Sequence, residues 1–225
     1  MSAYFVTATG TDIGKTFVAR GLIRALRARG RKVAALKPVV SGFDPAEAAG
    51  SDSGLLLSAL GRPVTAETIA EISPWRFAAP LAPDTAAARE GRTLDIRELI
   101  RFCRDAIAET RGVLLIEGAG GVMSPVNADH VMLDWMTALD LPVILVAGSY
   151  LGTISHTLTA LDVIARRDLK VAALVISETS GSPVGLGTTR ETLARFAPQL
   201  AVLAVPRLAP AGPVHAAFEC MADRL

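Results

Sequence analysis

Residues 7–16, Thr-Ala-Thr-Gly-Thr-Asp-Ile-Gly-Lys-Thr, decide the fold of this chain. The apolar run Ala3-Tyr4-Phe5-Val6 before them predicts a buried first strand, and apolar residues recur at helical spacing over residues 16–29 after them. A strand, a glycine-containing turn, Gly-Lys-Thr and a helix in this order are typical of a phosphate-binding loop.

Each part of this loop has a physical role. Backbone N–H groups and the positive end of the following helix suit a polyphosphate, Lys15 would reach its outer phosphates, and the Thr16 hydroxyl would hold Mg2+. The pattern GxxxxGK[ST] is not fully matched, because its first glycine would fall at Thr9 and the nearest one is Gly10. A glycine-rich helix entry with a solvated lysine is the alternative, but the position after a first strand favours a nucleotide site.

Composition bounds the class of protein. The chain has 225 residues, of which 51% are hydrophobic and 20% charged, with a formal net charge of +1. This length and apolar content fit one domain over residues 1–225, and the near-neutral charge gives no reason to expect a nucleic acid or a membrane surface as partner. Two cysteines are too few for a disulfide framework, no basic start opens a signal peptide, and the apolar runs are too short to span a bilayer. We therefore expect a cytoplasmic protein.

Apolar runs and helical patterns alternate along the chain. Continuous rather than alternating apolar runs are typical of strands covered on both faces. The sequence therefore predicts an α/β fold with a mostly parallel central sheet, helices on both faces and right-handed crossovers, like the P-loop NTPases. The expected strands are 4–7, 33–38, 113–117, 143–147, 171–176 and 202–205, and the expected helices are 16–29, 52–60, 95–110, 130–139, 153–167 and 187–196. The proline-rich stretch 43–92 is expected to form loops and short helices over the top of the sheet.

Ligands of an open parallel sheet bind off the carboxyl ends of its strands. This rule selects the segments that follow each expected strand, although they lie far apart in the sequence. They are the phosphate loop, Lys37–Gly42, Glu117–Gly121, Gly148–Gly152, Ser177–Glu178 and Pro206–Leu208.

Three charged residues near these strand ends can carry chemistry. Glu117 closes an apolar strand as the acidic residue of a Walker B element does, and the glycines after it favour a magnesium ligand over a helix cap. Lys37 ends a buried strand before a proline, and from position alone it either extends out from the sheet edge or points into the crevice. Asp52 in Gly-Ser-Asp-Ser reads, without further information, as part of a helix N-cap. The three histidines have no metal-binding spacing, and Trp75 and Trp135 are expected in the core or a lid.

Motifs spread over nearly the whole chain, in the same order, resemble those of the dethiobiotin synthetases. They are the phosphate loop, Lys37-Pro-Val-Val-Ser-Gly42, Ser51-Asp52, Glu90-Gly-Arg92, Glu117-Gly-Ala-Gly-Gly121, Asp134-Trp135, Leu141-Pro-Val-Ile-Leu145 and Leu151-Gly152…His156. The resemblance implies an enzyme of biotin biosynthesis that uses ATP, CO2 and Mg2+ to convert 7,8-diaminononanoate into dethiobiotin through a carbamate and its phosphate. It also implies a homodimer.

The resemblance also assigns roles to residues. Lys15 and Lys37 are implied as catalytic, and Thr16, Asp52 and Glu117 as ligands of Mg2+. Nucleotide binding is implied for Asp12, Ile13, Gly14, Lys15, Thr16, Phe17, Glu117, Gly118, Ala119, Gly120, Ser177, Glu178, Pro206, Arg207 and Leu208. Substrate binding is implied for Thr11, Lys37 and Ser41, and, through a helix entry that grips the carboxylate tail at a dimer interface, for Leu151, Gly152 and Ser155.

The chain departs from the family pattern in the loop, where Ala8 replaces a glycine, and after the expected fifth strand, where Ser177-Glu178 replaces the asparagine that reads adenine. Further departures are Ser155, which replaces an asparagine, and the region of Pro213, where the family has an acidic residue. We expect a reshaped turn, a relaxed choice of nucleobase and a weaker hold on the substrate tail.

Two other functions share this fold. A partner-regulated partition or septum-placement ATPase would need a second lysine early in the loop, and none precedes Lys15. An amidating ligase of cofactor biosynthesis would bring a glutaminase domain with a nucleophilic cysteine, which we do not expect in these 225 residues.

Overall fold

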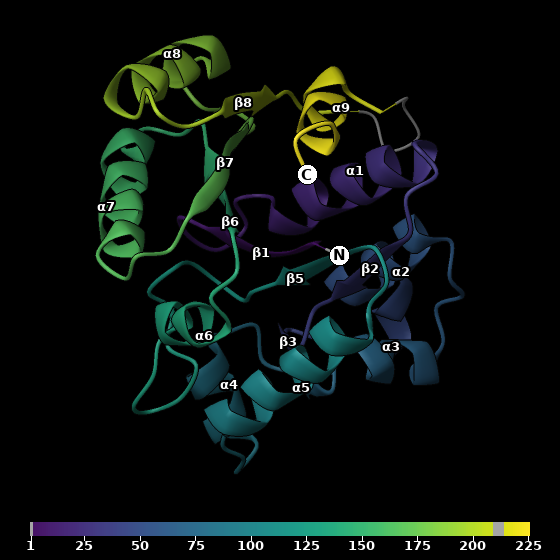
Figure 1. Ribbon diagram of the computed structural model, residues 1–225. Helices are drawn as coiled ribbons and strands as arrows, with labels where there is room; N and C mark the ends of the chain where they lie inside the picture. The colour runs from purple at the N-terminus through teal and green to yellow at the C-terminus, as the bar shows by residue number, and fades with distance from the viewer. Residues whose placement is uncertain (1, 209–213) are drawn as a thin grey trace.

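The computed structural model describes residues 2–208 and 214–225 (Figure 1), so the expectation about Pro213 lies outside the described residues. The described part contains a fully parallel six-stranded sheet with the order β2-β5-β1-β6-β7-β8. Its strands are β1 (Ser2–Ala8), β2 (Val33–Leu36), β5 (Val113–Glu117), β6 (Val143–Gly148), β7 (Val171–Ser177) and β8 (Val202–Val205). The predicted α/β class and each of the predicted strands are confirmed, except that β2 ends at Leu36 and not at Pro38.

Helices cover both faces of this sheet (Figure 1). On one face lie α1 (Lys15–Ala28) and α9 (Ala216–Ala222), and on the other lie α5 (Ile96–Glu109), α6 (Met132–Leu139) and α7 (Thr153–Ala165). The helix α8 (Leu186–Phe196) packs against β7 and β8. This distribution follows from right-handed crossovers, because the chain moves to one side of β1 to form β2 and to the other side to form β6, β7 and β8.

The register of the sheet determines which strand ends are neighbours. Val6 of β1 pairs with Glu117 of β5, so the acidic residue lies beside the strand that leads into the phosphate loop. On the other side of β1, Ala8 pairs with Val146. The carboxyl ends of β5, β1 and β6 therefore form one continuous edge, where the predicted site should lie.

The proline-rich stretch forms loops and short helices, as predicted. It contains the 3-10 helix η1 (Pro45–Gly50) and the helices α2 (Asp52–Leu60), α3 (Ala66–Ile72) and α4 (Pro83–Arg89). A small parallel pair, β3 (Val39–Ser41) with β4 (Trp75–Phe77), was not predicted. Pro38 lacks an N–H, and the Lys37 N–H donates to the carbonyl of Ile72, so the chain leaves the main sheet at this point and starts a second one.

The core confirms the expected placement of Trp135. Its indole is fully buried and meets the Phe5 ring edge-to-face at 5.0 Å between centroids. Trp75 is half-buried and makes a similar contact with Phe102. Both cysteines are free thiols. No helix in the described ranges is long and apolar enough to cross a bilayer.

The helix α9 was not predicted, and it closes the sheet face that carries α1. Phe218 of α9 is buried and meets Phe17 of α1 edge-to-face at 5.8 Å. Gly21 of α1 makes this close approach possible, because a Cβ atom there would lie 2.3 Å from the Phe218 ring. The phosphate-loop helix is therefore held from behind by the C-terminal helix.

We predict that Phe218→Ala lowers the free energy of unfolding by about 3 kcal/mol, because it removes a buried aromatic ring and leaves a cavity against Gly21. Urea unfolding followed by circular dichroism measures the change. Phe196→Ala is the matched control, since that ring is 59% exposed and its loss should change stability by less than about 1 kcal/mol. Equal effects of the two substitutions would contradict the packing role of α9.

Candidate active site

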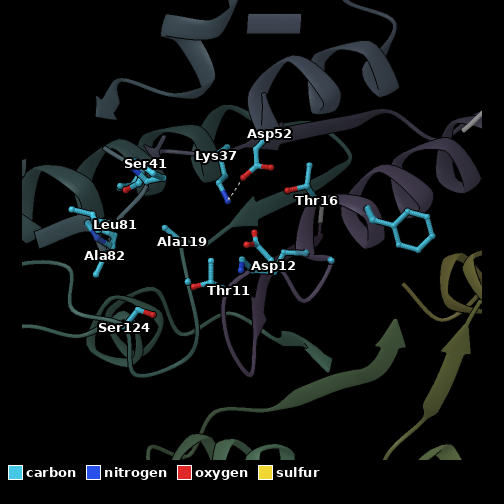
Figure 2. A pocket seen from close by; sticks show the side chains of 17 residues that line it. Thr11, Asp12, Thr16, Lys37, Ser41, Asp52, Leu81, Ala82, Ala119 and Ser124 are labelled. Carbon is cyan, nitrogen blue, oxygen red and sulfur yellow. Dashed lines mark ion pairs between the residues drawn. The ribbon is translucent and has the colours of Figure 1, made fainter. Parts of the chain in front are cut away.

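A cavity of about 650 Å3 lies at the carboxyl edge of the sheet (Figure 2). It is formed by the phosphate loop, the segment after β2, the start of α2, the loop after β5 and the loop before α4. The lining residues are Thr11, Asp12, Gly14, Lys15, Thr16, Phe17, Lys37, Val39, Ser41, Asp52, Pro80, Leu81, Ala82, Pro83, Ala119, Gly120 and Ser124. Eleven of the residues predicted from the sequence line it, and Glu117, which does not line it, accepts hydrogen bonds from two of them, Thr16 and Lys37.

The phosphate loop contains two residues with a positive φ. Asp12 has a φ of 56°, in the left-handed region that side chains rarely adopt, and Gly14 at the entry to α1 has a φ of 103°. Gly10 packs backbone against backbone on Gly121, where a Cβ atom would lie 3.1 Å from the Gly10 Cα. Gly121 thus allows the loop after β5 to approach the phosphate loop, and the expected reshaping of the turn relative to the family stays a prediction.

Lys37 points into the crevice and not out from the sheet edge. Lys37 as a whole is only 3% exposed. Its ammonium donates to Glu117 Oε1 at 2.6 Å and to the Gly118 carbonyl at 2.9 Å. It also forms an ion pair with Asp52 Oδ2 at 3.1 Å (Figure 2). A buried ammonium with three oxygen partners connects β2, β5 and α2 at one point.

The charges of this cluster stabilise one another. Burial alone would lower the pKa of Lys37, but the carboxylates of Glu117 and Asp52 outweigh it and raise that pKa above its usual value. Burial would raise the pKa of Asp52, but the Lys37 ammonium outweighs burial and lowers that pKa, with a smaller contribution in the same direction from the nearby Thr16 hydroxyl. Both groups are therefore charged at neutral pH. The side chain of Ser51, not Asp52, caps α2 by accepting from the Gly54 N–H, so Asp52 is free for the ion pair.

The predicted magnesium ligands lie together. Thr16 Oγ1 donates to Glu117 Oε1 at 2.6 Å, and Asp52 faces the same point from the start of α2. Glu117 Oε2 is buried and has no hydrogen-bond partner among the described residues. An unpaired buried carboxylate oxygen beside a hydroxyl and a second carboxylate fits a small divalent cation that completes its shell with phosphate oxygens and water. The described residues contain no group of three or more histidine, cysteine or acidic side chains that could hold a metal on its own.

The buried ammonium of Lys15 has fewer oxygen partners than that of Lys37. Its ammonium reaches the Gly10 carbonyl at 3.3 Å. Burial, and then repulsion from Lys37, lower the pKa of Lys15 to about 8 despite the attraction of Glu117, Asp52 and Asp12. The loop therefore holds a destabilised positive charge, which an anionic ligand would stabilise.

The two predicted substrate hydroxyls face the cavity from different sides. Thr11 lies near Ala119 and Ser124, and Ser41 lies beside Leu81 (Figure 2). Ser41 Oγ is buried without a partner among the described atoms. The wall near Ser41 is apolar and contains Pro80, Leu81 and Ala82, so one side of the cavity is charged and the other side suits an alkyl chain.

The residues after β7 and β8 lie beside the loop but outside the lining of the cavity. Ser177 packs against Gly14, where a Cβ atom would lie 2.7 Å from the Ser177 hydroxyl. Glu178 accepts from the Arg207 backbone N–H at 2.9 Å, which ties the two strand ends together. Pro206 and Leu208 flank this contact, and Ile13 packs on the core instead of lining the cavity.

The predicted tail-binding residues form a separate group at the start of α7. Gly152 caps this helix with a φ of 96°, Leu151 before it is 78% exposed, and Ser155 is exposed in the first turn. His156 in the same turn contacts the Tyr150 hydroxyl at 2.9 Å. None of these residues lines the cavity described above.

Several lining residues were not predicted. Pro80, Leu81, Ala82 and Pro83 enter the site because Gly42, with a φ of 73°, lets Pro80 pack against the end of β3. Ser124 enters because the glycines after Glu117 turn the chain back over the loop. The cluster of prolines near residue 80 was a signal of a rigid segment, but its place in space depends on tertiary packing.

Comparisons with known proteins identify close relatives. A family model described as an AAA domain matches residues 2–214. The protein named ATP-dependent dethiobiotin synthetase BioD from Methylobacterium nodulans is 53% identical over 203 residues, which cover 88% of this chain and 90% of that protein. The protein of the same name from Phenylobacterium zucineum is 50% identical over 226 residues, covering 100% of this chain and 97% of its own length.

Solved structures with the same fold are more distant. MinD from Pyrococcus horikoshii, complexed with Mg-ADP, aligns with a TM-score of 0.57 at 15% identity over 99% of this chain and 94% of its own. A ParA family ATPase from Chlorobium tepidum aligns with a TM-score of 0.56 at 13% identity over 100% of this chain and 99% of its own. At these identities the likeness shows the fold alone, and it confirms the predicted P-loop NTPase fold.

We predict that Lys15→Met stabilises the ligand-free protein at pH 7 by about 1 to 3 kcal/mol, since each unit of pKa shift corresponds to about 1.4 kcal/mol. The pKa of Lys15 in the folded protein, about 8, is below the ordinary 10.5. Its charge therefore destabilises the fold fully below pH 8, and this cost disappears as the pH rises from 8 to 10.5. Urea unfolding at pH 7 and pH 10 tests this, with the exposed Lys170→Met as control. If Lys15→Met instead lowered the free energy of unfolding at pH 7, the charge of Lys15 would not be destabilising the ligand-free protein.

Proposed function

Because the chain belongs to the ATP-dependent dethiobiotin synthetase family, we propose that it carboxylates 7,8-diaminononanoate and closes the ureido ring of dethiobiotin. The family resemblance inferred from the sequence motifs is thereby confirmed. The observation that best supports the reaction is the convergence of two lysines, two carboxylates and a threonine hydroxyl on one cavity.

The proposed reaction has three steps. One amine of the diamine adds to CO2 and loses a proton, which gives a carbamate. A carbamate oxygen then attacks the terminal phosphorus of ATP, so that ADP leaves and a carbamic–phosphoric anhydride forms. The second amine attacks the carbonyl carbon, phosphate leaves with the bonding electrons, and the amine proton is lost as the ring closes. A carbamate is a weak nucleophile, so we expect catalysis mainly from positioning and charge neutralisation.

Lys15 and Lys37 are proposed as the catalytic cations. Both ammonium groups are buried at adjacent parts of the cavity, where low dielectric strengthens their action on phosphoryl oxygens. Lys15 would bind the outer phosphates from the loop. Lys37 would stabilise the negative charge that develops on the carbamate and on the transferred phosphoryl group.

Thr16, Asp52 and Glu117 are proposed to hold Mg2+. The unpaired Glu117 Oε2 and the neighbouring Asp52 carboxylate supply the hard oxygen donors that this ion prefers. When bound, Mg2+ supplies charge neutralisation on the phosphates. The three side chains would hold that charge near Lys15.

The remaining nucleotide contacts are proposed along the loop and the neighbouring strand ends. The backbone from Asp12 to Phe17, with the loop from Glu117 to Gly120, would surround the phosphates. The base would lie toward β7 and β8, where Ser177, Glu178 and Pro206–Leu208 lie beside the loop. The contact between Ser177 and Gly14 supports this direction.

The substrate is proposed to extend from the hydroxyls of Thr11 and Ser41 toward a partner subunit. In a homodimer, Leu151, Gly152 and Ser155 of the helix entry would take the carboxylate tail, because a helix N-terminus favours an anion. The exposed Leu151 supports an interface at this position. Hydrolysis stimulated by the diamine and CO2, and not by a protein partner, would separate this function from that of the MinD and ParA proteins of the same fold.

We predict that Lys37→Ala lowers turnover at least about a hundredfold while nucleotide affinity changes less than about fivefold, because Lys37 acts on charge that develops during the reaction. Incorporation of labelled CO2 into dethiobiotin measures turnover, and calorimetry with Mg-ADP measures affinity. Lys37→Gln keeps a hydrogen-bond donor to the buried Glu117 but removes the charge. If this variant still binds Mg-ADP and also loses turnover, the loss of turnover comes from the missing charge and not from misfolding. Retained product formation in the alanine variant would refute the catalytic role.

We also predict that the enzyme discriminates between ATP and CTP by less than about tenfold, since a lost bidentate base contact is worth on the order of 1.4 kcal/mol or more. Ser177 cannot pair with both edge groups of adenine as an asparagine can. Competition between the two nucleotides in the same incorporation assay measures the ratio. Strict preference for ATP would show that another group reads the base.

A further inference from the structure

Ser124 is held rigidly at the rim of the cavity by the loop between β5 and α6. Its backbone N–H donates to the Gly121 carbonyl at 3.0 Å, and its carbonyl accepts from Met132 at 2.8 Å. Its hydroxyl accepts from the Gly121 N–H at 2.7 Å. Gly120 has a φ of 69°, and a Cβ atom there would lie 2.2 Å from Ser124 Oγ, so only glycine allows this turn.

The Ser124 hydroxyl has a donor that the protein does not use. Its oxygen is occupied as an acceptor by the Gly121 N–H, and no acceptor for its proton lies among the described residues. The side chain lines the cavity (Figure 2). A hydroxyl that accepts one hydrogen bond and keeps its proton free presents that proton to whatever occupies the cavity.

Ser124 and Thr11 flank Gly120 on the same side of the site. A Cβ atom on Gly120 would lie 2.2 Å from the Ser124 oxygen and 3.8 Å from that of Thr11. Thr11 is exposed, and the buried Ser41 oxygen has no hydrogen-bond partner among the described residues. The side chains of Ser124, Thr11 and Ser41 therefore line one cavity, and Lys37 and Asp52 form its charged side.

We propose that Ser124 binds and orients the diamine substrate by donating its hydroxyl proton to an oxygen of the carbamate. This inference rests on the proposed function and extends it to a residue outside the site predicted from the sequence. A carbamate carries a negative charge over two oxygens. Lys37 can attract one oxygen, and a neutral donor on the other side fixes the rotation of the group, so that the second amine faces the carbonyl carbon.

The test compares Ser124→Ala with Ser124→Thr and with Ser58→Ala. Ser58 is an exposed serine of α2 outside the cavity, so it controls for the loss of a hydroxyl as such. We expect Ser124→Ala to lower kcat/KM for diaminononanoate about tenfold or more, mainly through kcat, because the hydroxyl acts on the carbamate that forms after the diamine has bound. Ser124→Thr, which keeps the hydroxyl, should have a kcat/KM within about threefold of the wild-type value. Ser58→Ala should also have a kcat/KM close to the wild-type value.

Binding of Mg-ADP by calorimetry separates orientation from structure. If Ser124 only supported the loop, its loss would disturb Gly118, whose carbonyl holds Lys37, and nucleotide affinity would fall together with diamine affinity. That result, or an unchanged kcat/KM in Ser124→Ala, overturns the inference while the wild-type activity stands. A wild-type protein that incorporates no CO2 overturns the proposed function and the inference with it.

Discussion

The site depends on one buried ammonium, that of Lys37, which holds Glu117 and Asp52 together at the edge of the sheet. A charge without partners in this environment would cost several kcal/mol, so the segments that carry the two carboxylates are constrained to meet it. Thr16 joins the same cluster by donating a hydrogen bond to Glu117, and the Gly118 carbonyl is the third oxygen that accepts from the Lys37 ammonium. The β2, β5 and α2 segments are thereby positioned by the same group that faces the phosphate loop.

Much of this arrangement could be predicted because parallel strands place their carboxyl ends on one edge. Continuous apolar runs identified the strands, and the rule that ligands bind at such an edge brought Lys15, Lys37 and Glu117 together although they lie far apart in the chain. The orientation of Lys37 could not be decided from its position alone. The structure decides it, since the ammonium has three oxygen partners inside and none outside among the described residues. The chemical roles of these residues remain predictions.

Other features could not be predicted because they depend on tertiary contacts. The strands β3 and β4 have three residues each, too few for a hydrophobic period, and they form only because Pro38 takes the chain out of the main sheet. The helix α9 is similarly short, and its apolar side chains find a partner only because Gly21 leaves room for Phe218. Ser124 carries no motif of its own. Its place in the cavity follows from the turn at Gly120, a local conformation set by packing.

The contact between Ser177 and Gly14 limits how this sequence can change. Gly14 must remain glycine because of its positive φ, so the space beside it belongs to residue 177 alone. A side chain larger than serine at position 177 must turn away from the Gly14 backbone, because only the absence of a Gly14 Cβ atom leaves room for the Ser177 hydroxyl. The two positions therefore form a pair, and a substitution at one of them changes the space that is available to the other.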